Sequence, residues 1–160
     1  MCGFIAVFQR GAPLDGRVFK NALDTLSHRG PDYTGFLIDS VNADTGEVYA
    51  GLGHCRLAIV DLDARSNQPF TEEDCHLVYN GEIYNFRDLK NKYEYKLPYR
   101  TDSDTEFLHR VVRQHGDKFF DDLNGMWSFC FFDKLKNIAI KYNVSYTNIQ
   151  YIRSYRSWNK

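Results

Sequence analysis

Cysteine is the second residue of the chain, and at that position it can supply two reactive groups at once. When Met1 is removed, as is usual before a small residue, Cys2 carries a thiol and a free α-amine. The amine has an ordinary pKa of about 7.7–8.0, so part of it is neutral at pH 7 and can accept a proton through a water. The thiolate can then attack an acyl carbon. Gly3 leaves room for a substrate, and the alternative for Cys2 is a small buried residue.

The segments that must position Cys2 are predicted from their apolar spacing. Gly3–Gln9 is an apolar, β-branched and aromatic run typical of a buried strand, so the start of the chain should lie inside the structure. Arg17–Leu26 repeats apolar residues at three- and four-residue steps, which predicts an amphipathic helix that the segment His28–Asp32 terminates. Further strands are predicted at Gly35–Ile38, Val48–Leu52, Ala58–Val60, His76–Tyr79 and Met126–Phe132.

Two helix starts are marked by capping residues. Asn85 is placed to cap a helix over Phe86–Lys90. Ser103 and Glu106 form a capping box, and the helix that follows should end at Gly116. Because strands and helices mix without regular βαβ spacing, we predict an α+β domain of stacked sheets and helices.

Five short motifs follow one another in residues 1–133. They are Met1-Cys2-Gly3-Phe4, Ser27-His28-Arg29-Gly30-Pro31-Asp32, Gly53-His54-Cys55-Arg56-Leu57-Ala58-Ile59-Val60-Asp61, Asn80-Gly81-Glu82-Ile83-Tyr84-Asn85 and Ser103-Asp104-Thr105-Glu106. Together they resemble the glutaminase domain of class II glutamine amidotransferases, in the glutamine-hydrolysing asparagine synthetase branch. The resemblance implies an N-terminal-nucleophile hydrolase fold of stacked antiparallel sheets with flanking helices. It also implies hydrolysis of L-glutamine to glutamate and ammonia through a thioester on Cys2.

The resemblance assigns the oxyanion-stabilising role to Asn80 and Gly81. Attack on an amide creates a tetrahedral oxyanion that needs two preorganised donors. The Asn80 side-chain amide and the Gly81 backbone N–H would supply them, since glycine allows a close backbone approach. On its own, the Asn-Gly pair favours a type I′ hairpin turn.

Three charged residues are implied to recognise the amino-acid end of glutamine. Arg56 would bind the α-carboxylate as a planar, two-pronged donor. Asp104 would accept a hydrogen bond from the α-ammonium, and Glu82 would contact the same group or order its loop. The ordinary alternatives are a solvated charge for Arg56 and a favourable helix-dipole interaction for Asp104.

Other segments of the motifs are expected to shape the mouth of the pocket. These are Ser27–Asp32 and the turn Gln68-Pro69-Phe70. His28 and His54 allow a cysteine–histidine alternative like that of papain-like proteases, but an N-terminal cysteine already carries its own base.

The sequence contains no phosphate-binding G-x-x-x-x-G-K-[ST] or G-x-G-x-x-G loop, and it lacks the Ser-Gly-Gly pyrophosphate loop of the asparagine synthetase family. We therefore expect no cofactor and no metal on this chain, with ATP and Mg expected only on a separate synthetase domain. The expected partners are L-glutamine, a synthetase domain or subunit that receives ammonia for asparagine synthesis or a related amidation, and a second copy of the chain. The alternatives are a glutaminase domain of another class II branch, such as aminosugar or purine synthesis, and a catalytically inactive regulatory or binding module.

Composition excludes several other classes of protein. The chain has 160 residues, with 20 Lys+Arg against 21 Asp+Glu, so its balance does not favour nucleic-acid or membrane-surface binding. Its apolar runs are too short to span a bilayer, and its start lacks a secretory signal, which predicts a cytoplasmic protein. The scattered cysteines Cys2, Cys55, Cys75 and Cys130 predict free thiols and no structural zinc.

The last part of the chain departs from the motif pattern. We predict a glutaminase domain at 1–133 and a divergent tail at 134–160, which carries six basic residues and no acid. Basic residues interleaved with aromatic ones can indicate single-stranded nucleic-acid binding, and the tail's aromatic residues are Tyr142, Tyr146, Tyr151, Tyr155 and Trp158. A shifted or prematurely ended reading frame is the favoured interpretation, because the composition changes where the family motif fails. The domain's C-terminal part would then be incomplete. The tail should pack poorly and leave an unpaired edge near Met126–Phe132.

Overall fold

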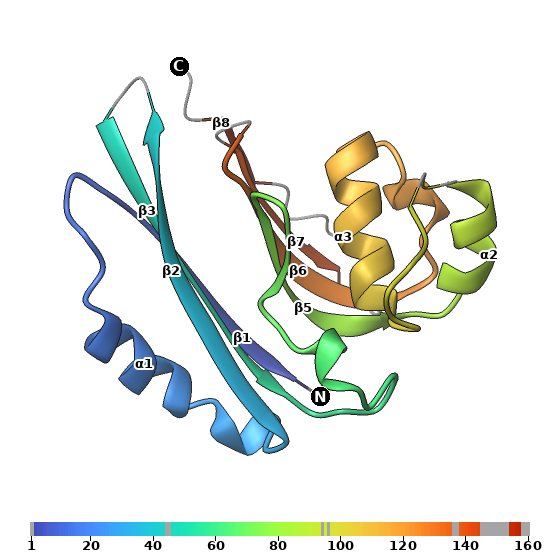
Figure 1. Cartoon of the computed structure of the whole chain (residues 1–160), viewed down its shortest axis with the longest axis horizontal. Helices are drawn as coiled ribbons and strands as arrows, with labels where there is room; N and C mark the ends of the chain where they lie inside the picture. The colour runs from blue at the N-terminus through green and yellow to red at the C-terminus, as the bar shows by residue number, and fades with distance from the viewer. Residues whose placement is uncertain are drawn as a thin grey trace.

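The chain forms an α+β fold of two antiparallel sheets, as predicted (Figure 1). The computed structural model describes residues 2–43, 46–93, 95, 97–135, 138–144 and 154–157, the last two stretches as backbone. The first sheet has the order β1–β3–β2, made of β1 (Gly3–Arg10), β2 (Tyr33–Ala43) and β3 (Gly46–Arg56). The second sheet has the order β4–β5–β6–β7–β8, made of β4 (Phe70–Glu72), β5 (Cys75–Ile83), β6 (Gly125–Asp133), β7 (Ile138–Val144) and β8 (Ser154–Ser157).

Helices cover the outer faces of both sheets. The helices are α1 (Gly16–Asp24), α2 (Phe86–Lys92) and α3 (Asp104–His115). Figure 1 shows α1 against the first sheet and α2 and α3 against the second, so the layers run helix, sheet, sheet, helix. No described helix has the length and hydropathy that crossing a bilayer would require.

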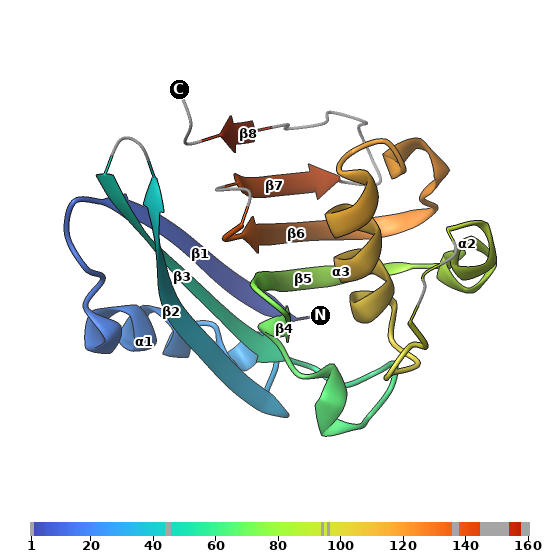
Figure 2. The ribbon, with the colours of Figure 1, turned by 45° about the horizontal axis from the view of Figure 1, so that its top comes forward.

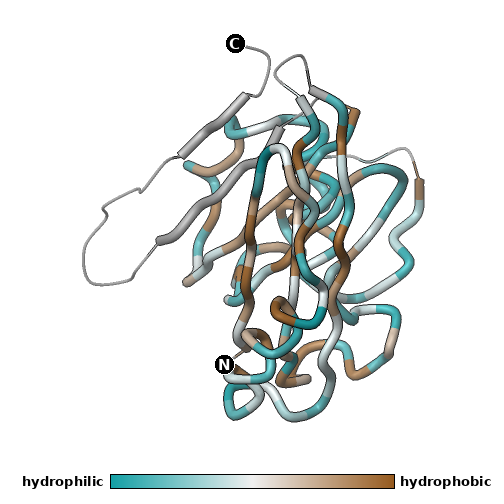
Figure 3. Tube along the Cα trace, turned by 90° about the vertical axis from the view of Figure 1, so that its left-hand side faces the viewer, coloured by the Kyte–Doolittle hydropathy of each residue, from teal (hydrophilic) through white to brown (hydrophobic). Residues whose placement is uncertain are grey.

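Alternation along the strands divides the interior into two cores, because successive strand side chains point to opposite faces. The core between the sheets contains Val48, Ala50, Leu52, Val78, Cys130 and Phe132. The core under α2 and α3 takes the intervening residues of β5 and β6, including Leu77, Tyr79, Trp127, Phe129 and Phe131. Figure 3 shows hydrophobic and hydrophilic residues alternating along the strands of the first sheet. Both faces of β5 are therefore covered.

Helix α1 begins one residue before the predicted start. Asp15 caps it, with Oδ1 accepting from Arg17 N at 2.9 Å and Val18 N at 3.1 Å. The helix ends at Asp24, so Leu26 of the predicted range lies in the turn that follows.

The predicted cap of α2 is only partly correct. Asn85 precedes the helix as expected, but its side chain makes no capping bond. It instead donates to Asp122 O at 2.8 Å and accepts from Asn124 N at 3.0 Å. Asn85 thus joins the start of α2 to the turn before β6.

Half of the predicted capping box of α3 is present. Ser103 Oγ accepts from Thr105 N at 3.0 Å, and the helix ends before Gly116 as expected. Glu106 does not turn back to Ser103: its Oε2 accepts from Thr101 N at 2.7 Å, and its Oε1 pairs with Arg110 at 2.8 Å. Because Glu106 and Arg110 are both buried, each charge needs the other, and this pairing overrides the local cap.

The predicted strand at Ala58–Val60 is wrong, because this segment is a loop. Ala58 N donates to Asp32 Oδ2 at 2.8 Å, and the Arg56 side chain donates to carbonyl oxygens farther along the loop. The segment folds around Arg56 instead of pairing with a strand.

The expected unpaired edge near Met126–Phe132 is also wrong. Strand β7 pairs with β6 from Trp127 opposite Val144 to Asp133 opposite Ile138, and β8 pairs with β7 in turn (Figure 2). The tail's backbone supplies these strands although its sequence leaves the motif pattern. Tyr146, Tyr151 and Trp158 lie outside the described residues, as do the side chains of Tyr142 and Tyr155, so their interpretation and the boundary at 133 stay predictions.

Candidate active site

Cys2 lies immediately before β1, at one end of the space between the two sheets. Strand β1, which begins directly after Cys2, contacts β5 of the second sheet. The Cys2 Sγ receives a hydrogen bond from Leu57 N at 3.3 Å and lies 3.6 Å from Leu57 O, to which it donates. Arg29 Nε donates to Cys2 O at 3.0 Å. The half-buried Cys2 is thus held through its thiol by Leu57 and through its carbonyl by Arg29, which come from separate motifs.

The motif Ser27–Asp32 packs against the end of β3 and so supports the loop after β3, in which Leu57 bonds the Cys2 thiol. A Cβ on Gly30 would lie only 2.3 Å from Cys55 O, so only glycine fits this approach. Asp32 N donates to Arg56 O at 3.0 Å, and the Asp32 side chain holds the loop after β3, as described above. The expected packing role of this motif is consistent with these contacts.

Asn80 and Gly81 lie within β5 and do not form a hairpin turn. Asn80 is opposite Ser128 and Gly81 is opposite Trp127 in the pairing with β6. Strand alternation places Asn80 on the same face as Val78, which packs against the first sheet. Asn80 therefore belongs to the face of β5 that looks toward the sheet where Cys2 begins.

Gly81 approaches β6 too closely for any other residue. A Cβ at this position would lie 2.3 Å from Met126 O and 2.6 Å from Trp127 Cα, and both of these are backbone atoms that cannot move aside cheaply. The glycine is thus required by space, independently of any role for its N–H.

Arg56 is buried and directed into the loop that follows β3. Its Nη1 donates to Asp63 O at 3.1 Å and Asn67 Oδ1 at 2.7 Å, while its Nη2 donates to Asp61 O. Arg56 is therefore not a solvated surface charge. Its buried side chain instead organises the loop that supplies Leu57. Guanidinium has five N–H donors, so these three bonds leave capacity for a carboxylate.

Asp104 stands in the first turn of α3 and is joined to β5 at two points. Its Oδ2 accepts from Tyr79 Oη at 2.7 Å and from Ile83 N at 3.0 Å. Burial raises the pKa of Asp104 above its ordinary value, the two hydrogen bonds oppose this rise, and the nearby Glu82 charge adds to it. The carboxylates of Asp104 and Glu82 are close enough to affect each other, so together they offer a site for a cation.

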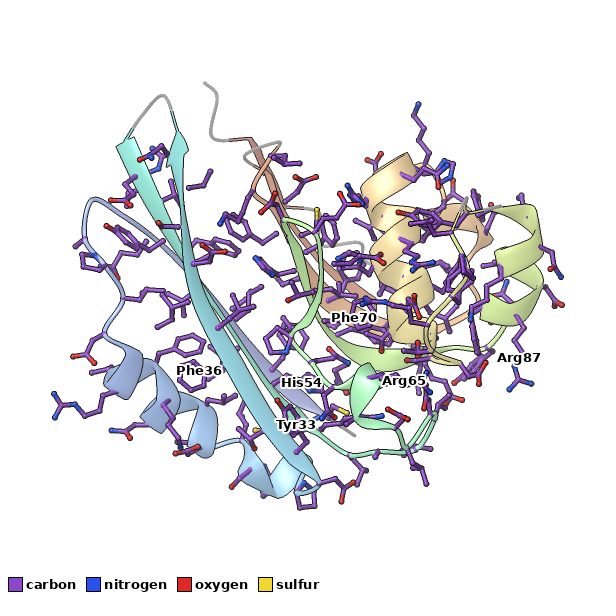
Figure 4. The ribbon with its side chains drawn as sticks, viewed as in Figure 1. Tyr33, Phe36, His54, Arg65, Phe70 and Arg87 are labelled. Atoms are coloured by element: carbon purple, nitrogen blue, oxygen red, sulfur yellow. The ribbon has the colours of Figure 1, made fainter. Side chains whose placement is uncertain are left out.

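The histidine alternative finds no support among the described residues. His54 Nε2 donates to Tyr79 O at 3.0 Å across the two sheets, and burial lowers its pKa to about 4 (Figure 4). His28 Nδ1 lies 3.0 Å from Thr25 O on the exposed surface. Within the described part of the chain, the hydrogen bonds of the Cys2 thiol are made with Leu57 and neither histidine takes part.

Three residues that make hydrogen bonds within the site were missed from the sequence. Arg29 holds the Cys2 carbonyl, Tyr79 binds Asp104, and Gln68 Oε1 accepts from Tyr79 N at 2.6 Å. Arg29 and Gln68 lie in the motifs assigned to the pocket mouth, and Tyr79 directly precedes Asn80, so adjacency to the motifs was the available signal. No group of three or more His, Cys, Asp or Glu side chains in the described ranges is arranged to hold a metal ion.

Comparison with known proteins adds a family assignment to this geometry. Residues 1–141 match the family described as "Glutamine amidotransferase domain". The glutamine-hydrolysing asparagine synthetase of Asparagus officinalis is 38% identical over 88% of this chain and 23% of its own length. Asparagine synthetase B of Escherichia coli is 36% identical over 74% of the chain and 21% of its length, and amidase chry2 of Gibberella zeae is 32% identical over 72% and 16%. The chain therefore spans less than a quarter of the length of these curated relatives.

Proposed function

Because the chain belongs to the glutamine amidotransferase domain family, we propose that it hydrolyses the side-chain amide of L-glutamine to glutamate and ammonia with Cys2 as the nucleophile. The observation that carries this function is the position of the Cys2 sulfur: Leu57 N donates a hydrogen bond to it, and the Cys2 side chain interacts with Tyr79, the residue before Asn80 in β5. No imidazole contacts the thiol among the described residues, so the base must come from elsewhere. The α-amine of processed Cys2 fills that role.

The reaction follows from these groups. The amine takes the thiol proton, and the sulfur attacks the side-chain amide carbon of glutamine. The oxyanion that forms accepts hydrogen bonds from the Asn80 side chain and the Gly81 N–H, two residues whose backbone is held by the pairing of β5 with β6. Protonated by the ammonium group of Cys2, the amide nitrogen leaves as ammonia. Water then hydrolyses the thioester, releasing glutamate and restoring the thiol.

The amino-acid end of glutamine binds to charged groups around this centre. Arg56 has N–H donors beyond those used in its loop and takes the α-carboxylate. Asp104 and Glu82 together take the α-ammonium, whose positive charge relieves the repulsion between the two carboxylates. This charge relief gives the site a preference for a free amino acid over a simple amide.

The ammonia passes to a synthetase domain or subunit, in which ATP and Mg²⁺ would activate the acceptor. The names of the relatives favour asparagine as the product, and the amidase name keeps a related amidation open. The matched stretch covers less than a quarter of each of these three relatives, so the acceptor-activating part corresponds to sequence outside this match. A class II branch with another acceptor shares the same glutaminase chemistry.

Ammonia release by purified protein, with the N-terminus defined by mass spectrometry, tests the proposed function. The chain that has lost Met1 should release glutamate and ammonia from glutamine, and Cys2→Ala should release neither. Cys75→Ala is the matched control, because it removes a buried thiol at the other end of β5 and should keep the activity. Hydrolysis that survives in Cys2→Ala would overturn the role of Cys2 as the nucleophile. An inactive processed wild type would overturn the proposal as a whole and favour the inactive module.

A further inference from the structure

Tyr79 joins the two halves of the proposed site, although no role in the reaction has been given to it. It directly precedes the oxyanion residue Asn80, and its hydroxyl donates to Asp104 at 2.7 Å. The residue is 3% exposed, and its ring packs in the core under α2 and α3. One residue therefore connects the strand of the oxyanion donors to the carboxylate assigned to the substrate ammonium.

The backbone of Tyr79 is fixed from both sides. Its N–H donates to Gln68 Oε1 at 2.6 Å, and Gln68 is itself buried. Its carbonyl accepts from His54 Nε2 at 3.0 Å, which ties β5 to β3. A side chain on a backbone held in this way has little freedom, so the position of its hydroxyl is determined before substrate arrives.

Both bonds from β5 to Asp104 are made to the same oxygen. Tyr79 Oη and Ile83 N each donate to Oδ2, while Oδ1 has no part in either contact. An aspartate can rotate about its last side-chain bond, and two donors on one oxygen remove that rotation. The other oxygen is then directed in one way only.

We infer that Tyr79 is a positioning residue for glutamine binding, an inference that rests on the proposed function. Its hydroxyl holds Asp104 Oδ2 so that Oδ1 faces the substrate ammonium. The hydroxyl also favours the ionised carboxylate, which the ammonium requires, because it donates a hydrogen bond to the negative charge. Burial and the Asp104 charge raise the pKa of Tyr79, so it remains a neutral donor across the working pH range.

The charged groups around Asp104 set the direction of the pH effect. Burial and the charge of Glu82 on β5 raise the pKa of Asp104, whereas the hydrogen bonds from the Tyr79 hydroxyl, Ile83 N and the Asp104 backbone N–H lower it. Lys90 on α2 also interacts with Asp104, and the Cys2 side chain interacts with Tyr79. Loss of the Tyr79 hydroxyl removes one stabilising donor and leaves the Glu82 repulsion and burial in place. The pKa of Asp104 should then rise.

Tyr79→Phe tests this role, with Tyr93→Phe as the matched control. Tyr93 also donates its hydroxyl to a carboxylate, that of Asp122, but it contacts none of the proposed site residues in the described structure. In Tyr79→Phe the KM for glutamine should rise about tenfold, as expected for loss of a hydrogen bond to a charged group, while kcat changes less than about threefold. The acid limb of kcat/KM should move to higher pH, and Tyr93→Phe should change neither quantity. An unchanged KM and pH profile in Tyr79→Phe would overturn the inference.

A second measurement keeps the inference separate from the proposed function. The carboxyl carbon of Asp104 can be followed by NMR in the ¹³C-labelled full chain, with Asp104→Asn to assign it. Its titration should move to higher pH in Tyr79→Phe, and identical titrations in the two proteins would overturn the positioning role. An inactive wild type would refute the proposed function alone, since this titration would still decide whether Tyr79 controls Asp104.

Discussion

Replacing Asn80 by Ala separates a catalytic role from a structural one. Asn80 lies inside the paired strand β5, and no hydrogen bond of its side chain is present among the described contacts, so alanine should cost little folding stability. If its amide stabilises the oxyanion, kcat should fall by about 10²–10³, which corresponds to about 2.7–4 kcal/mol of transition-state stabilisation. The KM should change little, because the interaction forms only in the transition state.

Asn85→Ala is the matched control and should show the opposite result, with lower folding stability and an unchanged kcat. Its side chain makes two hydrogen bonds that join α2 to the turn before β6, so its loss should destabilise the fold by about 1–3 kcal/mol. Its kcat at a temperature where the protein stays folded should be near that of the wild type. Urea unfolding and ammonia release, measured on both variants, give the comparison. A twofold or smaller change in kcat for Asn80→Ala, or a loss of kcat that follows unfolding, would refute the oxyanion role.

Three further predictions follow from the structure. Gly81→Ala should destabilise the fold by about 1–3 kcal/mol, measured by urea unfolding, because its Cβ would lie 2.3 Å from Met126 O; unchanged stability would contradict this packing. Arg56→Lys should raise the KM for glutamine about tenfold, since a lysine cannot reproduce the fork of donors, and an unchanged KM would place the carboxylate site elsewhere. Burial lowers the pKa of both His54 and His109 from 6.5 to about 4, so stability that is full above pH 6.5 should fall toward pH 4, by about 2 kcal/mol per histidine at pH 5. Urea unfolding at pH 7.5 and pH 5 measures the loss, and equal stabilities would contradict it.

The fold class and most elements could be predicted from the sequence, because alternation and helical spacing are local signals. The strand at Gly3–Gln9, the helix starting at Asp104 and its end before Gly116 are confirmed. The strand at Ala58–Val60 is wrong because a distant partner, Asp32, and the buried Arg56 side chain bend the segment into a loop. Such contacts depend on the tertiary fold and leave no periodic pattern.

The candidate site shows the same division between local and tertiary information. Cys2 and Asn80 are readily selected by residue type and motif, and the structure adds their neighbours. The contact of Arg29 with the Cys2 carbonyl and that of Tyr79 with Asp104 join residues 27 and 25 positions apart. The capping role predicted for Glu106 was overridden by its buried ion pair with Arg110, which a local rule cannot anticipate.

Labelling by a glutamine-mimicking electrophile tests the central claim most directly, because it identifies the reacting atom. The chain that has lost Met1 should form one covalent adduct, located on Cys2 by peptide mass spectrometry, and excess glutamine should slow its formation. The other thiols, including Cys55 and Cys130, are buried and should remain unlabelled. Equal labelling of Cys55 or Cys130, or labelling that persists in Cys2→Ala, would contradict the assignment of Cys2 as the nucleophile.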